Sequence, residues 1–269
     1  MPKTLPGLMA PGPFRADQIR SGDPYELSDG HPIRCLPTGG RGSRANLIGA
    51  AVLDSDPAVE SAGVDTGFAL SPTTLRAPDV AVGNVVDAPG WVKGQAPSLA
   101  VEYADAGQDE AELADRVADL LAGGTRLLWV VRLVGPRRVE VHAPGAPMRL
   151  AYPGDLLEAP GILRNPVPVE ALFDRDAAHE ATLRNLLQRH GYRDLEEVRE
   201  EARSAGKEEG GAAAGLAALR EALLLVLAQR ALDLDPDQHA AITDCTDADR
   251  LRHWLGRAAV AEHLSQVFG

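Results

Sequence analysis

A change in the spacing of apolar residues near residue 173 constrains the fold of this 269-residue chain more than any other feature. From Tyr25 to about Phe173, short apolar runs are separated by Gly, Pro and Asp, a pattern typical of β-strands and the turns between them. After Phe173 the strand signals stop and apolar residues recur at helical spacing. The sequence therefore predicts an α/β (α+β) core followed by an all-helical C-terminal appendage.

The core region contains short strands that flank one clear helix. Strands are expected at residues 67–70, 79–82, 99–102, 127–133 and 139–142. The segment 109–122 carries apolar residues at helical spacing, and Gly123 and Gly124 follow it as a plausible helix C-terminus. A second helix is expected at 46–53. This order predicts a mixed sheet flanked by helices.

The C-terminal region is predicted to be helical throughout. Helical periodicity covers residues 180–205 and 216–232, and Pro236 stands at a favourable first-turn position of a short helix. Thr246, followed by Asp249, is expected to cap a last helix. We therefore expect a flexible lead-in at 1–24, a core domain at 25–173 and a helical tail at 174–269.

Composition excludes several classes of protein. The net charge is −12, which disfavours a basic coat protein for nucleic acids but still allows a nuclease whose metal ions meet the phosphates. No apolar run approaches the roughly 20 residues of a membrane helix, and the start of the chain is a poor signal peptide. The two cysteines, Cys35 and Cys245, are far apart and fit a reducing cytoplasm, where we expect the protein.

Two carboxylates stand at the ends of otherwise apolar strands. Asp79 begins the run DVAV, and Glu102 closes the run SLAVE. A carboxylate buried in a sheet is costly unless it is paired or binds a cation, and Mg²⁺ is typically held by one or two carboxylates together with phosphate and water. Two interpretations remain open: a metal site for a phosphodiesterase, or strand ends that meet solvent or pair with arginines.

Several ordered motifs resemble one known family. These are YELSDG at residues 25–30, RAPDVAV, LAVEY, the following helix, and GGTRLLWVVRLVGPRRVEVH. In this order they resemble the Uma-two family of restriction-endonuclease-like proteins, within the PD-(D/E)XK nuclease superfamily. The resemblance spans about residues 25–173. It implies a restriction-endonuclease-like mixed sheet and divalent-metal-dependent cleavage of DNA phosphodiester bonds.

The resemblance also implies a set of site residues. Asp79 matches the motif aspartate and Glu102 the second acidic ligand, so both would bind Mg²⁺ or Mn²⁺. Glu26 matches an upstream acidic residue of the site. The lysine usual in the superfamily two residues after the second acid is Ala104 here, and the lysine that Uma-two proteins carry on the following helix is Arg116.

This arginine matters chemically, because an arginine keeps its charge at neutral pH whereas a desolvated lysine can lose a proton. The chain has 24 arginines and three lysines, and Lys93 is the only lysine between the two acidic residues. Further departures from the family are Ala104-Asp105-Ala106 for Ser-Pro-Ser, Leu120 for a tyrosine and Arg44 for a histidine. Four arginines are candidates for phosphate contacts or for a solvated rim: Arg41, Arg44, Arg137 and Arg138.

Two functions from different classes follow. The first is a metal-dependent DNA endonuclease with Asp79, Glu102, Glu26 and Arg116 in its site. The second is a catalytically inactive nuclease fold that acts as a binding or assembly module. In that case the apolar face of residues 216–232 would pack against another copy of the chain or a protein partner.

Overall fold

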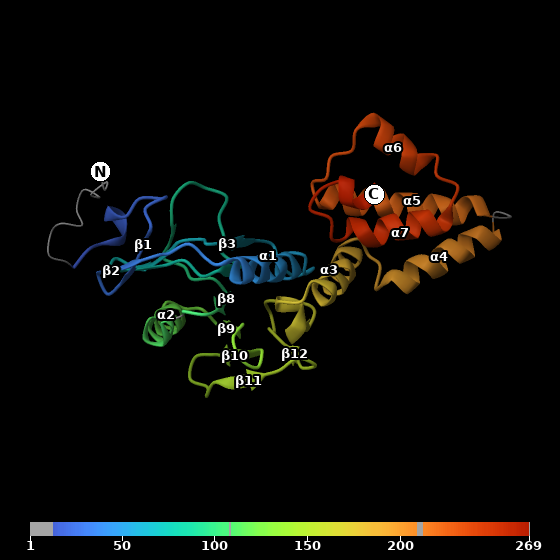
Figure 1. Ribbon diagram of the computed structural model, residues 1–269. Helices are drawn as coiled ribbons and strands as arrows, with labels where there is room; N and C mark the ends of the chain where they lie inside the picture. The colour runs from blue at the N-terminus through green and yellow to red at the C-terminus, as the bar shows by residue number, and fades with distance from the viewer. Residues whose placement is uncertain (1–12, 108, 209–211, 269) are drawn as a thin grey trace. The chain divides into compact units, whose positions relative to one another are not determined.

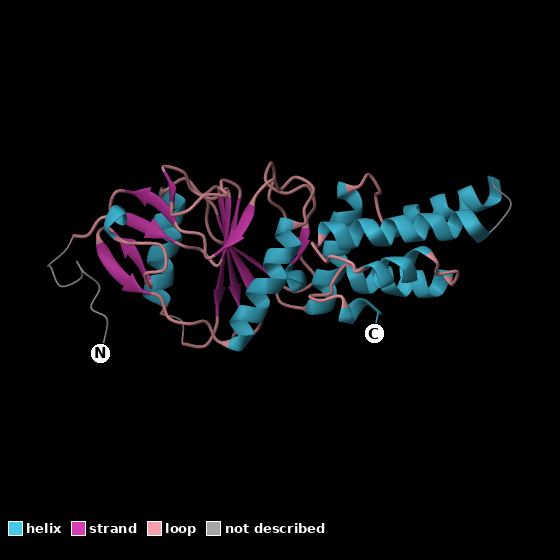
Figure 2. Ribbon diagram, turned by 90° about the horizontal axis from the view of Figure 1, so that it is seen from above, coloured by secondary structure: helices cyan, strands magenta, loops and turns pink. Residues whose placement is uncertain are grey.

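The computed structural model describes residues 13–107, 109–208 and 212–268, and it divides the chain into two compact units (Figure 1). The α/β unit comprises Met1–Asp54 and Ala58–Ala178. The helical unit comprises Ser55–Pro57 and His179–Gly269. The helical unit shows helices without strands, whereas the α/β unit combines both kinds of element (Figure 2).

A six-stranded mixed sheet forms the centre of the α/β unit. Its order is β11-β10-β9-β8-β6-β3, and within this sheet only the β8–β9 pair is parallel among the described strands. The strands are β3 (Ala62–Val64), β6 (Val80–Val82), β8 (Leu99–Ala104), β9 (Leu127–Arg132), β10 (Arg138–His142) and β11 (Arg149–Ala151). Every residue of β8 is buried, as expected for a central strand covered on both faces.

Two helices cover the two faces of this sheet. Helix α2 (Glu110–Ala122) packs Leu113, Val117 and Leu120 against the alternate β8 residues Ala100 and Ala104. Helix α1 (Gly40–Asp54) lies on the opposite face. There the Tyr103 hydroxyl lies 1.8 Å from where a Cβ on Gly49 would be, so this close approach requires glycine.

A second, five-stranded sheet holds the N-terminal part of the unit. Its order is β2-β1-β5-β4-β7, formed by β1 (Tyr25–Ser28), β2 (His31–Arg34), β4 (Phe68–Ser71), β5 (Thr74–Arg76) and β7 (Val92–Lys93). Asp29 and Gly30, both with positive φ, close the β1–β2 hairpin. A small two-stranded sheet, β12 (Leu156–Leu157) with β13 (Val167–Pro168), and the 3₁₀ helix η2 (Val169–Leu172) complete the unit.

The helical unit has its own apolar core. It contains α3 (Arg175–Arg189) from His179 onward, α4 (Leu195–Glu208), α5 (Ala212–Gln229), α6 (Pro236–Thr243), α7 (Ala248–Ala258) and α8 (Ser265–Phe268). The segment Ser55–Pro57 belongs to it, because the Arg189 guanidinium donates to the carbonyls of Ser55 (2.9 Å) and Asp56 (2.8 Å). No described helix combines the length and the apolar character needed to cross a membrane.

The apolar face of α5 was expected to pack against another chain, and this expectation was wrong. Leu219, Leu223, Val226 and Leu227 are all buried in the core of the helical unit itself, together with side chains of α7 such as Trp254. The described apolar residues of this face are therefore already covered within one chain.

Most of the expected elements are present. All five predicted strands are confirmed within one or two residues, and α2 follows its predicted bounds with Asp109 as N-cap. Gly124 adopts a φ of +110° after the end of α2, so the glycine pair ends the helix as expected.

Other expected elements differ in extent. Helix α1 begins at Gly40, six residues before its predicted start, because helical periodicity is weak across a glycine-rich first turn. Residues 180–205 form parts of two helices rather than one, since Gly191, with a φ of +92°, lies in the turn between them. The last long helix is capped by Asp247 and not by Thr246.

The segment expected to be a loose lead-in contains packed residues. Residues 1–12 lie outside the described residues. The 3₁₀ helix η1 (Ala16–Gln18) follows Phe14, and Phe14 and Ile19 are buried against Leu27 and Leu75 of the five-stranded sheet.

Candidate active site

The sheet register brings Asp79 and Glu102 to neighbouring positions. Strands β6 and β8 pair antiparallel with Val80 opposite Val101, so the next position outward places Asp79 opposite Glu102. Directly opposed residues of an antiparallel pair point to the same face. Asp79 is held by its Oδ2 atom, which accepts a 2.6 Å hydrogen bond from the backbone N–H of Tyr103. Asp79, which directly precedes β6, is therefore a neighbour of Glu102 on β8.

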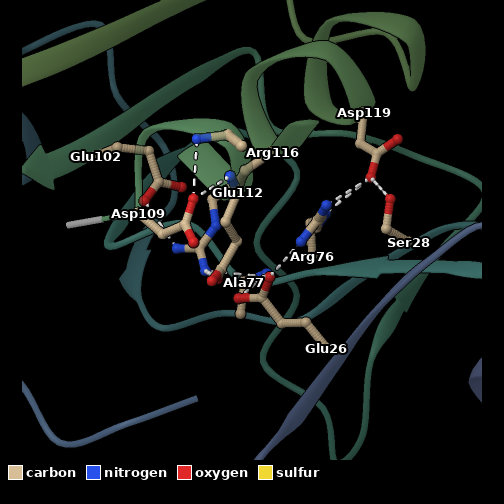
Figure 3. Close-up of polar contacts among 10 residues, drawn as sticks. Glu26, Ser28, Arg76, Ala77, Glu102, Asp109, Glu112, Arg116 and Asp119 are labelled. Carbon is tan, nitrogen blue, oxygen red and sulfur yellow. Dashed lines mark hydrogen bonds and ion pairs between the residues drawn. The ribbon is translucent and has the colours of Figure 1, made fainter. Parts of the chain in front are cut away.

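Glu26 joins the site from the other sheet. It lies on β1 and is 3% exposed. Its Oε1 atom accepts from the backbone N–H of Ala77 (3.3 Å), and its Oε2 atom accepts from Arg76 Nη1 (3.1 Å). The β1–β2 hairpin thus anchors a third carboxylate next to the segment that carries Asp79 (Figure 3).

Arg116 connects the carboxylates of the two sheets. It projects from α2, and its Nη1 atom donates to Glu102 Oε2 at 3.0 Å. Its Nη2 atom lies 3.4 Å from Glu26 Oε2 and 3.5 Å from Glu112 Oε1. Burial opposes its charge, but the carboxylates of Glu102 and Glu26 outweigh burial and raise the pKa of Arg116. Glu26 and Glu102 are therefore close together, with the charged Arg116 between them (Figure 3). Asp79 lies near all three, because the charges of Arg116 and Glu26 influence its pKa and its own charge raises the pKa of Glu102.

Sequence reasoning missed a second arginine of this cluster. Arg76 is fully buried and bridges Glu26 to Asp119 of α2, whose Oδ2 atom lies 2.9 Å from Arg76 Nε. The same Asp119 oxygen accepts from the Ser28 hydroxyl at 2.8 Å. The available signal was the position of Arg76 in the motif LRAPD, three residues before Asp79.

The site carries an excess of negative charge. Asp65, which follows β3, lies close to Asp79, because its backbone N–H donates to the Asp79 carbonyl at 3.4 Å. Among the described residues, two guanidinium groups, those of Arg76 and Arg116, face six carboxylates, which belong to Glu26, Asp65, Asp79, Glu102, Glu112 and Asp119. A cation is the ligand that this imbalance favours.

Burial leaves the charge of Glu102 poorly compensated. Its Oε1 atom is buried and has no hydrogen-bond partner in the described part of the chain, and burial raises the pKa of Glu102 to about 8. Burial likewise raises the pKa of Asp79 to about 6, although the Tyr103 N–H opposes this shift. An unpaired carboxylate oxygen inside a protein is costly, so it calls for a partner that the described residues do not supply.

The residues present fit an open two-carboxylate metal site. Among the described residues, no three His, Cys, Asp or Glu side chains are grouped so that they could hold an ion on their own. Asp79 and Glu102 supply two carboxylates, which is the protein contribution typical of Mg²⁺ when water and substrate phosphate complete the shell. The unpartnered Oε1 atom of Glu102 fits this role.

Neither alternative lysine position contributes to the site. Ala104 is buried against α2. Lys93 lies on β7 of the five-stranded sheet and lines a surface cavity with Trp91 and Arg15, a cavity that includes neither Asp79 nor Glu102. Arg116 is thus the basic residue that contacts the second acidic residue.

The comparison with known families matches residues 14–166, more than half of the chain, to the Uma2 family, whose description is "Putative restriction endonuclease". The chain belongs to the Uma2 family. The resemblance inferred from the motifs is thereby confirmed, and the match starts at Phe14, within the packed segment before β1. The matched region ends before α3, so helices α3 to α8 lie outside it.

A solved structure supports the fold assignment. A protein described as a "putative nuclease belonging to DUF820" from Anabaena variabilis superposes with a TM-score of 0.51. The alignment covers 62% of this chain and 99% of that protein, at 16% sequence identity. At this identity the likeness shows a shared fold, which confirms the expected restriction-endonuclease-like architecture. No curated protein matches the chain.

Proposed function

We propose that this Uma2 protein is an endonuclease that uses a divalent cation to hydrolyse DNA phosphodiester bonds. The observation that carries the proposal is the closeness of Asp79, which directly precedes β6, to Glu102 on the adjacent strand β8, with one buried Glu102 oxygen unpartnered. Membership of a family described as restriction endonucleases supports DNA as the substrate.

In this proposal Asp79 and Glu102 would hold Mg²⁺ or Mn²⁺. When bound, such a cation neutralises charge on the phosphate and makes water a stronger nucleophile at neutral pH. The protein holds the ligands in place beforehand. The Tyr103 N–H fixes one oxygen of Asp79, and Arg116 fixes one oxygen of Glu102, so that the second oxygen of each carboxylate is left to bind the ion.

Arg116 would act by its charge and not by moving a proton. Its contacts with Glu102 and Glu26 raise its pKa, so it stays cationic and cannot accept a proton from the attacking water. It can stabilise the negative charge that develops on the phosphate oxygens. Glu26 would help by orienting Arg116 and Arg76, which makes it a positioning residue.

The test compares plasmid cleavage by the full chain and by the Asp79→Asn variant, with Mg²⁺ or Mn²⁺ and with EDTA. Asparagine can still accept the Tyr103 hydrogen bond, so the fold should persist while the charge is lost. The matched control is Asp87→Asn, which removes one charge from an exposed loop. Cleavage that needs the cation, persists in the control and is lost in Asp79→Asn supports the proposal. Equal cleavage by Asp79→Asn and the native chain, or none by either, contradicts it.

The Arg116–Glu102 ion pair favours a second candidate, an inactive nuclease fold that binds a partner. An arginine that already neutralises part of Glu102 reduces the need for a metal ion. Calorimetry with Mg²⁺ separates the two candidates. Heat of binding that is lost in Asp79→Asn supports the endonuclease, and no binding to the native chain supports the inactive module.

A further inference from the structure

A second group of charged residues lies at the carboxyl end of β8, beyond the acidic site. Asp105 follows the last residue of β8 and forms a bidentate ion pair with Arg41 in the first turn of α1. The Arg41 Nε atom lies 3.0 Å from Asp105 Oδ2, and the Nη2 atom lies 2.5 Å from Oδ1. The Arg41 side chain remains 52% exposed, so this pair is open to solvent.

Arg137 belongs to the same group. It lies in the turn between β9 and β10, and its guanidinium stacks over the Phe173 ring at 4.7 Å from the centroid. The hydrogen bond from Arg41 lowers the pKa of Asp105, and the charge of Arg137 adds to this effect, which places Arg137 within electrostatic reach of Asp105. By contrast, Arg138 lies 3.3 Å from Glu140 on its own strand.

Strand β8 relates this group to the acidic site, because it carries Glu102 and leads directly to Asp105. Asp105 is three residues beyond Glu102, a span of about 10 Å along an extended chain. Strands β8 and β9 are parallel, so the turn that carries Arg137 emerges at the same end of the sheet. Arg41 and Arg137 therefore lie at the end of the sheet toward which β8 runs from Glu102.

We propose that Arg41 and Arg137 bind a backbone phosphate of DNA next to the cleaved bond, and that Asp105 occupies them as an internal phosphate mimic until DNA displaces it. This inference rests on the proposed function, because it takes DNA as the substrate. A guanidinium holds a carboxylate and a phosphate with the same two-pronged geometry, so one can replace the other without moving Arg41. An exposed ion pair contributes little to stability, so its opening costs little.

The mimic predicts that removing the charge of Asp105 tightens DNA binding by more than the general loss of one negative charge does. Binding of the full chain to a fluorescently labelled DNA duplex is measured by anisotropy in EDTA, which prevents metal-dependent cleavage, over a series of salt concentrations. Asp105→Asn should tighten binding several-fold more than the matched charge change Asp87→Asn. Arg41→Gln and Arg137→Gln should each weaken binding and reduce the slope of log affinity against log salt by about 1. Arg149→Gln, on the exposed edge strand β11, serves as the arginine control.

The outcomes separate this inference from the proposed function. If Asp105→Asn binds DNA no more tightly than Asp87→Asn, or if Arg41→Gln and Arg149→Gln behave alike, the phosphate mimic is wrong even where cleavage is confirmed. If the binding changes appear as expected but no metal supports cleavage, the DNA contact holds and the endonuclease fails. Absence of DNA binding by every variant overturns the inference.

Discussion

Two buried glutamates on the same face of the six-stranded sheet differ in how many of their carboxylate oxygens are bound by an arginine. Glu102 on β8 and Glu140 on β10 both lie opposite Val130 of the intervening strand β9. Both oxygens of Glu140 are bound by Arg132, at 2.9 Å and 3.0 Å. Glu102 has one oxygen bound by Arg116, and its other oxygen is buried without a partner.

A structural ion pair differs from a candidate site in whether its polar atoms all have partners. Arg132 also reaches Glu110 in the first turn of α2, so the Glu140 cluster ties the helix to the sheet with its polar atoms satisfied. The Glu102 cluster keeps an excess of carboxylates and an unpaired oxygen. Native proteins rarely leave such a group, and where they do it calls for an explanation such as a ligand or ion.

The largest effect should come from removing a carboxylate of the site. We expect Asp79→Asn to reduce DNA cleavage by roughly 100-fold or more, because loss of a metal ligand removes several kcal/mol of transition-state stabilisation. Glu140→Gln should cleave at close to the native rate. Initial rates on supercoiled plasmid at saturating Mg²⁺ measure both. A larger loss of activity in Glu140→Gln than in Asp79→Asn would reverse the assignment of the two clusters.

The free energy of unfolding should fall more in Glu140→Gln than in Asp79→Asn, the reverse of their order in cleavage. Glu140→Gln leaves the guanidinium of Arg132 without its main partner, so we expect the free energy of unfolding to fall by about 1–3 kcal/mol. Asp79→Asn should change it less, because asparagine keeps the hydrogen bond from Tyr103. Denaturant titration followed by circular dichroism measures both variants. Equal stability of Glu140→Gln and the native chain would show that the Arg132 cluster is not structural.

Lysine in place of the arginine of each cluster, Arg116 or Arg132, should affect cleavage in one cluster and stability in the other. Arg116→Lys should raise cleavage several-fold, since a buried lysine can exchange a proton with the attacking water and releases part of its hold on Glu102. Arg132→Lys is the matched control. It should lower the melting temperature without raising cleavage, because lysine cannot make both contacts with Glu140. No gain of cleavage in Arg116→Lys would mean that the charge of Arg116 is already sufficient.

The smallest effect is a pH dependence of stability. The raised pKa of Glu102, about 8 in the folded chain against 4.5 ordinarily, means that the folded state binds more protons than the unfolded state between these values. The free energy of unfolding should therefore fall as the pH rises toward 8. In EDTA between pH 6.5 and 8.5, the melting temperature of the native chain should decrease more steeply than that of Glu102→Gln. Parallel curves would show that Glu102 is ionised throughout, and added Mg²⁺ should flatten the native curve alone.

The predictable part of the molecule was the part encoded locally. Helix α2, with its Asp109 cap and its terminal glycines, and strand β8 depend on residues that are neighbours in the chain. Strand β7 has two residues and strand β2 has four that are mostly exposed, so neither carries an alternating apolar pattern and neither was predicted. The motif order supplied Glu26 and Arg116 through the family resemblance. The position of Arg76 three residues before Asp79 was a local signal, but it did not indicate which carboxylates Arg76 would bind.

Local patterns in the chain predicted the main strands, the helical C-terminal region and the acidic residues of the candidate site. Which arginine meets which carboxylate depends on long-range packing. Arg76 binds Glu26 and Asp119, which are 50 and 43 residues away, because strand pairing and the packing of α2 bring them together. Long-range packing also determines that α5 buries its apolar face within its own unit. Periodicity shows that a face is apolar or a strand carries a charge, but the partner depends on long-range packing, which no local pattern specifies.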